Sequence, residues 1–102
     1  MIYNKLVRDR IPEIIITQGE KPIIRILDEI EYRRCLEKKL DEEVAEFHAD
    51  RSVEELADIL EVIFALTEDC GYTKEQLFDI CNRKREKRGG FSKRIFLVRK
   101  EG

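Results

Sequence analysis

The sequence predicts a small all-α bundle of about four helices, with a minor two-stranded β element from residues 22–27 and 95–98. Apolar residues recur at the three-to-four-residue spacing of helices over three long segments. Capping residues and glycines delimit these segments. The chain has 102 residues, of which 42% are hydrophobic, so it can form one modest core. We therefore expect a single domain over 1–102.

The N-terminal part is expected to hold a short helix and one strand. Pro12 falls in the first turn of a helix over 8–16, a position that suits proline, and Gly19 follows the end of this helix. The run Pro-Ile-Ile-Arg-Ile-Leu at 22–27 is short and rich in β-branched residues, which favours an extended strand. We expect this strand to pair with the similar run at 95–98.

Three longer helices are delimited by their own start and stop residues. The first covers 29–49 and is broken by the polar stretch that follows it. The next two begin at capping boxes, in which a Ser or Thr side chain accepts from a backbone N–H three residues later. These boxes and their helices are Ser52 with Glu55 for 53–69, and Thr73 with Gln76 for 74–88, which ends at Gly89-Gly90.

The charge balance and the absence of long apolar runs exclude several classes of protein. The chain has 20 Lys+Arg against 22 Asp+Glu, whereas a general nucleic-acid-binding protein is usually clearly basic. No apolar run approaches the roughly 18–20 residues of a membrane span. The N-terminus lacks the apolar stretch of a signal peptide. We expect a cytoplasmic protein that binds neither a membrane nor nucleic acid.

The charges are segregated along the chain. Residues 41–61 contain nine acidic residues and one basic residue, whereas 83–100 contain nine basic residues and one acidic residue. One interpretation is that these are solvated helix faces of opposite sign. The other is that carboxylates hold a divalent metal while Lys and Arg side chains hold phosphate. Helical register bears on the choice between the two.

Glu43 falls at the edge of the core face of the helix over 29–49 when residues are placed about 100° apart around the axis. Lys39 and Glu46 follow along the same edge, so Glu43 and Glu46 project together. The expected core face of this helix consists of Leu36, Leu40, Val44 and Phe47.

Glu55 and Asp58 fall inside an apolar arc of the helix over 53–69. Two carboxylates in such a position are unfavourable unless they meet Lys or Arg, or bind a metal ion. The broad arc itself predicts an oligomer, because a lone small bundle could hardly cover it. Its expected core face is Leu56, Leu60, Ile63 and Phe64, and it is extended by Ile59, Val62, Ala65 and Leu66.

A cluster of four carboxylates is expected where these two helices meet. Helices joined by a short loop are normally antiparallel neighbours, which would bring Glu43, Glu46, Glu55 and Asp58 together. Converging carboxylates cannot all stay ionised without cations. Their hard oxygen atoms suit Mg²⁺, with Mn²⁺ as a second choice. Salt bridging in the core is the alternative.

Basic residues on the helix over 74–88 could hold phosphate. Lys84 and Arg88 continue the inner stripe of that helix toward its C-terminal end. Arg would bind phosphate as a fork and Lys as a point charge. The alternative is a favourable interaction of these cations with the helix C-terminus.

These segments resemble a known family. The ExxE of Glu43 and Glu46, followed by the ExxD of Glu55 and Asp58, resembles the all-α nucleoside triphosphate pyrophosphohydrolases. Four segments in order look like the short MazG-like proteins, often called phosphoribosyl-ATP pyrophosphohydrolase-like. They are YNKLVRDRIP at 3–12, KLDEE at 39–43, ELADILEV at 55–62 and KRGGF at 87–91.

The resemblance implies a Mg²⁺-dependent hydrolase that cleaves a nucleoside triphosphate or related nucleotide between its α- and β-phosphates. It implies a homodimer or homotetramer, with the four carboxylates as metal ligands. Glu43 or Glu46 would be the general base, and the substrate phosphates would meet Lys39, Lys84 and Arg88. The alternatives are a non-catalytic nucleotide- or metal-binding regulator on the same fold, the phosphoribosyl-ATP pyrophosphohydrolase of histidine biosynthesis, and a helical oligomerisation module whose charges serve only solubility.

Overall fold

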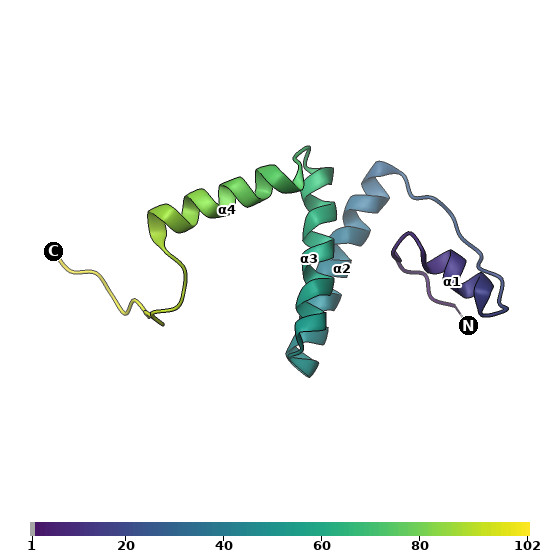
Figure 1. The fold of residues 1–102 in the computed structure, drawn as a ribbon, viewed down its shortest axis with the longest axis horizontal. Coiled ribbons are helices and arrows are strands. Elements are labelled where there is room, and N and C mark those ends of the chain that lie inside the picture. Colours follow the sequence, from purple (N-terminus) through teal and green to yellow (C-terminus); the bar gives the residue numbers. More distant parts are fainter. Residues whose placement is uncertain (1) are drawn as a thin grey trace.

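The computed structural model describes residues 2–102, and these residues form four helices and no strand (Figure 1). The predicted all-α class is confirmed. Two long antiparallel helices lie side by side at the centre, and the other two helices lie on either side of this pair. The helices are α1 (Ile11–Thr17), α2 (Glu29–Asp50), α3 (Val53–Asp69) and α4 (Lys74–Arg88).

The boundaries of the central pair follow from local hydrogen bonding. The Asp28 side chain accepts from the backbone N–H of Glu31 at 2.8 Å and starts α2. Arg51 adopts the left-handed conformation, with φ of 53°, which ends α2. Ser52 then accepts from the backbone N–H of Glu55 at 3.4 Å and starts α3. Only two residues therefore separate α2 from α3, and the chain must reverse direction.

The core lies between α2 and α3 and is very small. Among the described residues, only two apolar side chains are buried: Leu36 on α2, 3% exposed, and Val62 on α3, 8% exposed. The prediction that Leu56 and Leu60 form the core face of α3 is wrong, because they are 47% and 43% exposed. Helix α3 is apolar most of the way round, so its sequence could not indicate which side faces α2.

The predicted β pair is also wrong. Residues 22–27 are extended in the connection between α1 and α2, and residues 95–98 are extended in the C-terminal tail. The two segments lie at opposite ends of the molecule (Figure 1). Their β-branched composition favours an extended backbone, but a strand also requires a neighbour for its hydrogen bonds, and neither segment has the other within reach.

The outer helices are held loosely. Helix α4 starts at the predicted capping box, in which Thr73 and Gln76 exchange side chain to backbone hydrogen bonds. Among the described helices it contacts α3 alone, and this contact includes an edge-on pair of Phe64 and Phe78 with ring centroids 5.8 Å apart. Helix α1 begins at Ile11, later than predicted, and no described part of another helix packs closely against it.

The molecule is consequently elongated, with extents of 65 × 32 × 21 Å. Its radius of gyration is 18.2 Å, whereas a compact domain of this length would have about 13 Å. No helix in the described part of the chain is both long and apolar enough to cross a membrane.

Candidate functional site

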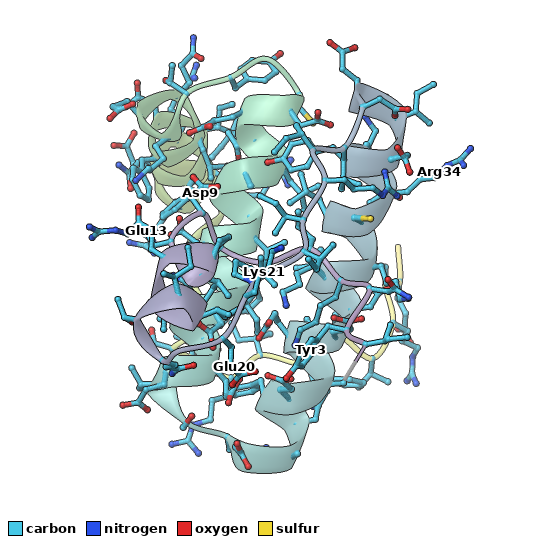
Figure 2. The ribbon with its side chains drawn as sticks, turned by 90° about the vertical axis from the view of Figure 1, so that its right-hand side faces the viewer. Tyr3, Asp9, Glu13, Glu20, Lys21 and Arg34 are labelled. Atoms are coloured by element: carbon cyan, nitrogen blue, oxygen red, sulfur yellow. The ribbon has the colours of Figure 1, made fainter. Side chains whose placement is uncertain are left out.

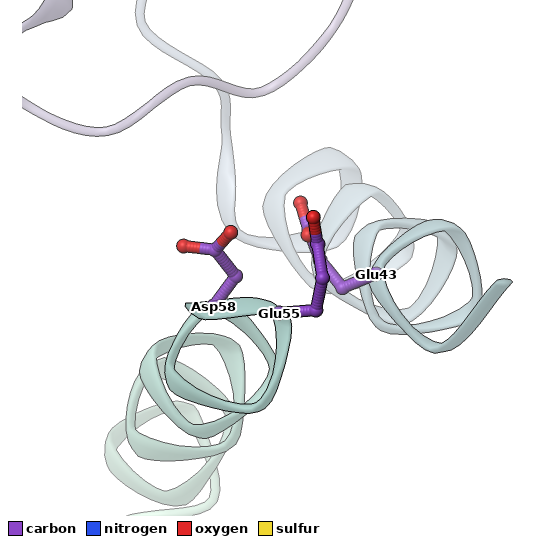
Figure 3. Close-up of side chains that lie close together, drawn as sticks. All are labelled: Glu43, Glu55 and Asp58. Atoms are coloured by element: carbon purple, nitrogen blue, oxygen red, sulfur yellow. The ribbon is translucent and has the colours of Figure 1, made fainter. Parts of the chain in front are cut away.

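Three carboxylates converge where α2 and α3 face each other. Glu43 projects from α2, and Glu55 and Asp58 project from the first two turns of α3 (Figure 3). One oxygen from each of the three lies within 4.8 Å of the others. The two residues of α3 are three positions apart, which places them on one side of the helix. We call this group the carboxylate cluster.

Burial makes the carboxylate cluster unusual. Glu43 is 8% exposed, and it is the one charged or polar residue among those described that is buried. Its Oε1 lies 3.5 Å from Nζ of Lys39, one turn earlier on α2. Its Oε2 is buried without a hydrogen-bond partner, and so is Oε2 of Glu55. A buried acceptor without a partner destabilises a fold by about 1–3 kcal/mol, and a charged one by more.

The pKa values of two cluster residues are raised, which reflects the same environment. Burial raises the pKa of Glu43 above its ordinary value of 4.5, and the negative charge of Glu46 raises it further. Lys39 opposes this shift. Burial is also the largest cause of the raised pKa of Glu55, followed by the charge of Glu46. Glu43 and Glu55 therefore hold their charges at the expense of folding free energy when no further cation is close.

Glu46 lies beside the carboxylate cluster rather than in it. Its side chain is exposed, and the set of mutually close oxygens comprises only Glu43, Glu55 and Asp58. Its charge nevertheless acts on both Glu43 and Glu55. Three of the four predicted carboxylates are thus brought together in one chain, and the fourth lies next to them.

Arg8 contacts the carboxylate cluster, which the sequence did not indicate. Its guanidinium donates to Oδ1 of Asp58 at 2.7 Å, across 50 residues of sequence. The N-terminal segment crosses in front of the α2–α3 pair (Figure 2), on the side to which the carboxylates point (Figure 3). Arg8 belongs to the YNKLVRDRIP segment. That motif was the available sequence signal for a functional role of Arg8, but it did not indicate what this side chain contacts.

The three predicted phosphate-binding cations lie in different places. Lys39 is half-buried and pairs with Glu43. Lys84 and Arg88 are exposed on α4, where they border a shallow hollow of about 300 Å³ with Ile80, Arg83 and Lys87. Helix α4 leaves the far end of α3 and projects away from the cluster (Figure 1). One chain therefore does not bring Lys84 and Arg88 to the carboxylates.

The donor set is chemically simple. All of its ligand atoms are carboxylate oxygens, and no cysteine or histidine belongs to the group. Oxygen-only sets suit hard divalent cations such as Mg²⁺ and Mn²⁺ rather than zinc. The two unpartnered oxygens are acceptors that such a cation would satisfy. The residues present therefore fit a divalent metal.

Comparison with known proteins identifies no family. No family model matches the chain, and no solved structure matches it. A protein of Mycolicibacterium smegmatis, described only as an uncharacterized protein, is 58% identical over 45 residues. These residues are 44% of this chain and 46% of that protein, so the match spans less than half of either. This similarity indicates a relative but assigns no activity.

Proposed function

We propose that this protein is a MazG-like, Mg²⁺-dependent nucleotide pyrophosphohydrolase, which cleaves a nucleoside triphosphate between its α- and β-phosphates. The products are the nucleoside monophosphate and pyrophosphate. The observation that carries this proposal is the carboxylate cluster, in which one oxygen of the buried Glu43 lies within 4.8 Å of oxygens of Glu55 and Asp58. The Oε2 of Glu43 also has no hydrogen-bond partner. The order of the four motif segments in the sequence supports the same family.

In this proposal Glu43, Glu55 and Asp58 hold the metal, and Mn²⁺ can replace Mg²⁺. When bound, the cation supplies positive charge for the phosphate oxygens and makes water more acidic. Glu46 accepts the proton of the attacking water, because it lies next to the cluster and keeps an exposed carboxylate. Glu43 serves as the alternative base, but its oxygens already face Lys39 and the cluster.

Lysine and arginine side chains around the site complete the binding of the triphosphate. Lys39 lies one turn from Glu43 and can bind a phosphate oxygen as a point charge. Lys84 and Arg88 serve this role only in a homodimer or homotetramer, in which α4 of one copy reaches the cluster of another. The exposed Leu56 and Leu60 of α3 give such an assembly an apolar surface to cover.

The direct test is a panel of canonical and damaged nucleoside triphosphates, together with phosphoribosyl-ATP, incubated with Mg²⁺ and assayed for pyrophosphate. We expect at least one substrate to be cleaved. Glu55→Gln and Asp58→Asn should abolish turnover while the far-UV circular dichroism stays unchanged. Glu61→Gln is the matched control, because Glu61 is an exposed residue of the same helix outside the cluster.

The outcomes separate the alternatives. Metal binding without cleavage of any triphosphate would support a regulator that binds metal or nucleotide without turnover. Cleavage of phosphoribosyl-ATP alone would assign the enzyme to histidine biosynthesis. Equal activity in Glu55→Gln, Asp58→Asn and Glu61→Gln would remove the cluster from the reaction and contradict the proposal.

A further inference from the structure

Two extended segments of this chain have backbone groups that the fold leaves unpaired. Within the described residues, no backbone hydrogen bond involves 22–27 or 95–98. Both segments are apolar and exposed: Ile26 is 88% exposed and Phe96 87%. An extended run with free N–H and C=O groups is a template for pairing with another strand.

The two segments match each other in character. Each is short, and β-branched or large apolar residues dominate both, as in paired strands. Their flanking charges are opposite. The tail carries Lys93, Arg94, Arg99 and Lys100 against Glu101, whereas the region around the first segment carries Glu20, Asp28, Glu29 and Glu31 against Lys21 and Arg25. Arg25 is paired with Glu31 at 2.8 Å, and Arg99 is paired with Glu101 at 2.7 Å. Each pair removes one charge of either sign, so the first segment keeps its acidic excess and the tail keeps its basic excess.

Within one chain these partners cannot meet. The first segment lies beyond α2, and the tail follows α4 on the opposite side of the central pair (Figure 1). The long dimension of the molecule is 65 Å. In a two-fold dimer, however, the tail of each copy can reach the first segment of the other, and both pairings then form at once.

We propose that this protein forms a dimer by reciprocal exchange, in which residues 95–98 of one copy pair as a β-strand with residues 22–27 of the second copy. The exchange satisfies both free backbone edges and buries the exposed isoleucines and phenylalanine. It requires no metal and no substrate, so it does not depend on the proposed hydrolase activity.

Cross-linking between differently labelled chains tests the pairing. One chain carries Ile24→Cys, and an isotope-labelled chain carries Phe96→Cys or Leu97→Cys. Adjacent strand residues point to opposite faces, so one of these two positions should react at least tenfold more than the other under copper–phenanthroline oxidation. Ile16→Cys on α1 is the matched control, because it is also well exposed. All chains first have their native cysteines replaced by serine, namely Cys35, Cys70 and Cys81.

A second measurement tests the backbone requirement. Phe96→Pro with Leu97→Pro removes two N–H donors, whereas threonine at both positions keeps the donors and a strand-forming side chain. By sedimentation, the proline variant should have a dimer dissociation constant at least tenfold higher than the threonine variant. Helicity should be the same in both, since no helix includes these residues.

Several results would overturn the exchange. The first is a wild-type protein that is monomeric at all concentrations, and the second is an equal dimer dissociation constant for the proline and threonine variants. The third is equal cross-linking by the Ile16→Cys control. The fourth is a disulfide that forms within a single dilute chain carrying both Ile24→Cys and either Phe96→Cys or Leu97→Cys.

Discussion

Replacing Glu43 with glutamine should stabilise the metal-free protein and destabilise the metal-loaded one. The substitution keeps the volume of a side chain that is 8% exposed, so packing changes little. It removes a buried charge whose Oε2 has no partner, which is unfavourable by about 1–3 kcal/mol. It also removes the interaction with Lys39, 3.5 Å away, which offsets part of the gain. We expect a net gain of about 1 kcal/mol in chelator at neutral pH, within that range.

The effect of metal should have the opposite sign. A cation present at 100 times its dissociation constant stabilises the wild type by about 2.7 kcal/mol, whereas the variant has lost a ligand and gains far less. Thermal unfolding measures both effects, since about 1 kcal/mol shifts Tm by roughly 4–8 °C in a domain of this size. The protein concentration is kept fixed, because oligomers unfold at concentration-dependent temperatures.

The matched control for this experiment is Glu61→Gln, which changes an exposed glutamate outside the cluster and should leave both stabilities within about 0.5 kcal/mol. Our reasoning would be refuted if Glu43→Gln lowered stability in chelator by more than the control. It would equally be refuted if saturating Mg²⁺ or Mn²⁺ stabilised the variant as much as the wild type.

Three further predictions concern neighbouring features. In chelator, the contribution of Glu43 to the free energy of unfolding should fall as pH rises from 4.5 through its raised folded-state pKa, because the folded state binds this proton more tightly than the unfolded state. Urea unfolding at several pH values should therefore show a more negative slope with pH for the wild type than for Glu43→Gln. Arg8→Ala should raise Mn²⁺ affinity in calorimetry, because it frees Oδ1 of Asp58. It should change the free energy of unfolding by only about 0–1 kcal/mol, since the Arg8–Asp58 pair is well exposed. Unchanged or weaker Mn²⁺ affinity would show that Arg8 does not compete with the metal. Thr73→Ala should destabilise α4 by about 1 kcal/mol, because it removes the capping box. Thr73→Ser is the control, since serine keeps the capping hydroxyl. An equal loss of stability for both variants in circular dichroism melting would show that the cap is not the cause.

The sequence was sufficient to predict the helices, because their ends depend on local chemistry. The capping residue of α4 lies three positions from the backbone N–H it binds, and a few residues decide such an interaction. The bounds of α3 and α4 agree with the prediction for the same reason. Helix α1 starts later than predicted, at Ile11, because Asp9 and Arg10 form a turn instead.

The candidate site was only partly predictable. The spacing of Glu43 on α2, and of Glu55 and Asp58 on α3, was enough to expect convergence across a short antiparallel connection, and the three carboxylates do converge. The position of Glu46 beside the cluster depends on how far each helix is rotated, which spacing alone does not fix. Arg8 reaches Asp58 from 50 residues away, and no local pattern encodes a contact at that separation.

By itself, the sequence determined which segments are helical and which carboxylates share a helix edge, since both follow from interactions over a few residues. Only the tertiary structure decided which side of α3 faces α2, because α3 is apolar around most of its circumference and packing alone selects the buried Val62 over Leu56 and Leu60. It also decided that the two extended segments lie apart, because strand pairing depends on long-range position, and in this chain α2, α3 and α4 separate the partners.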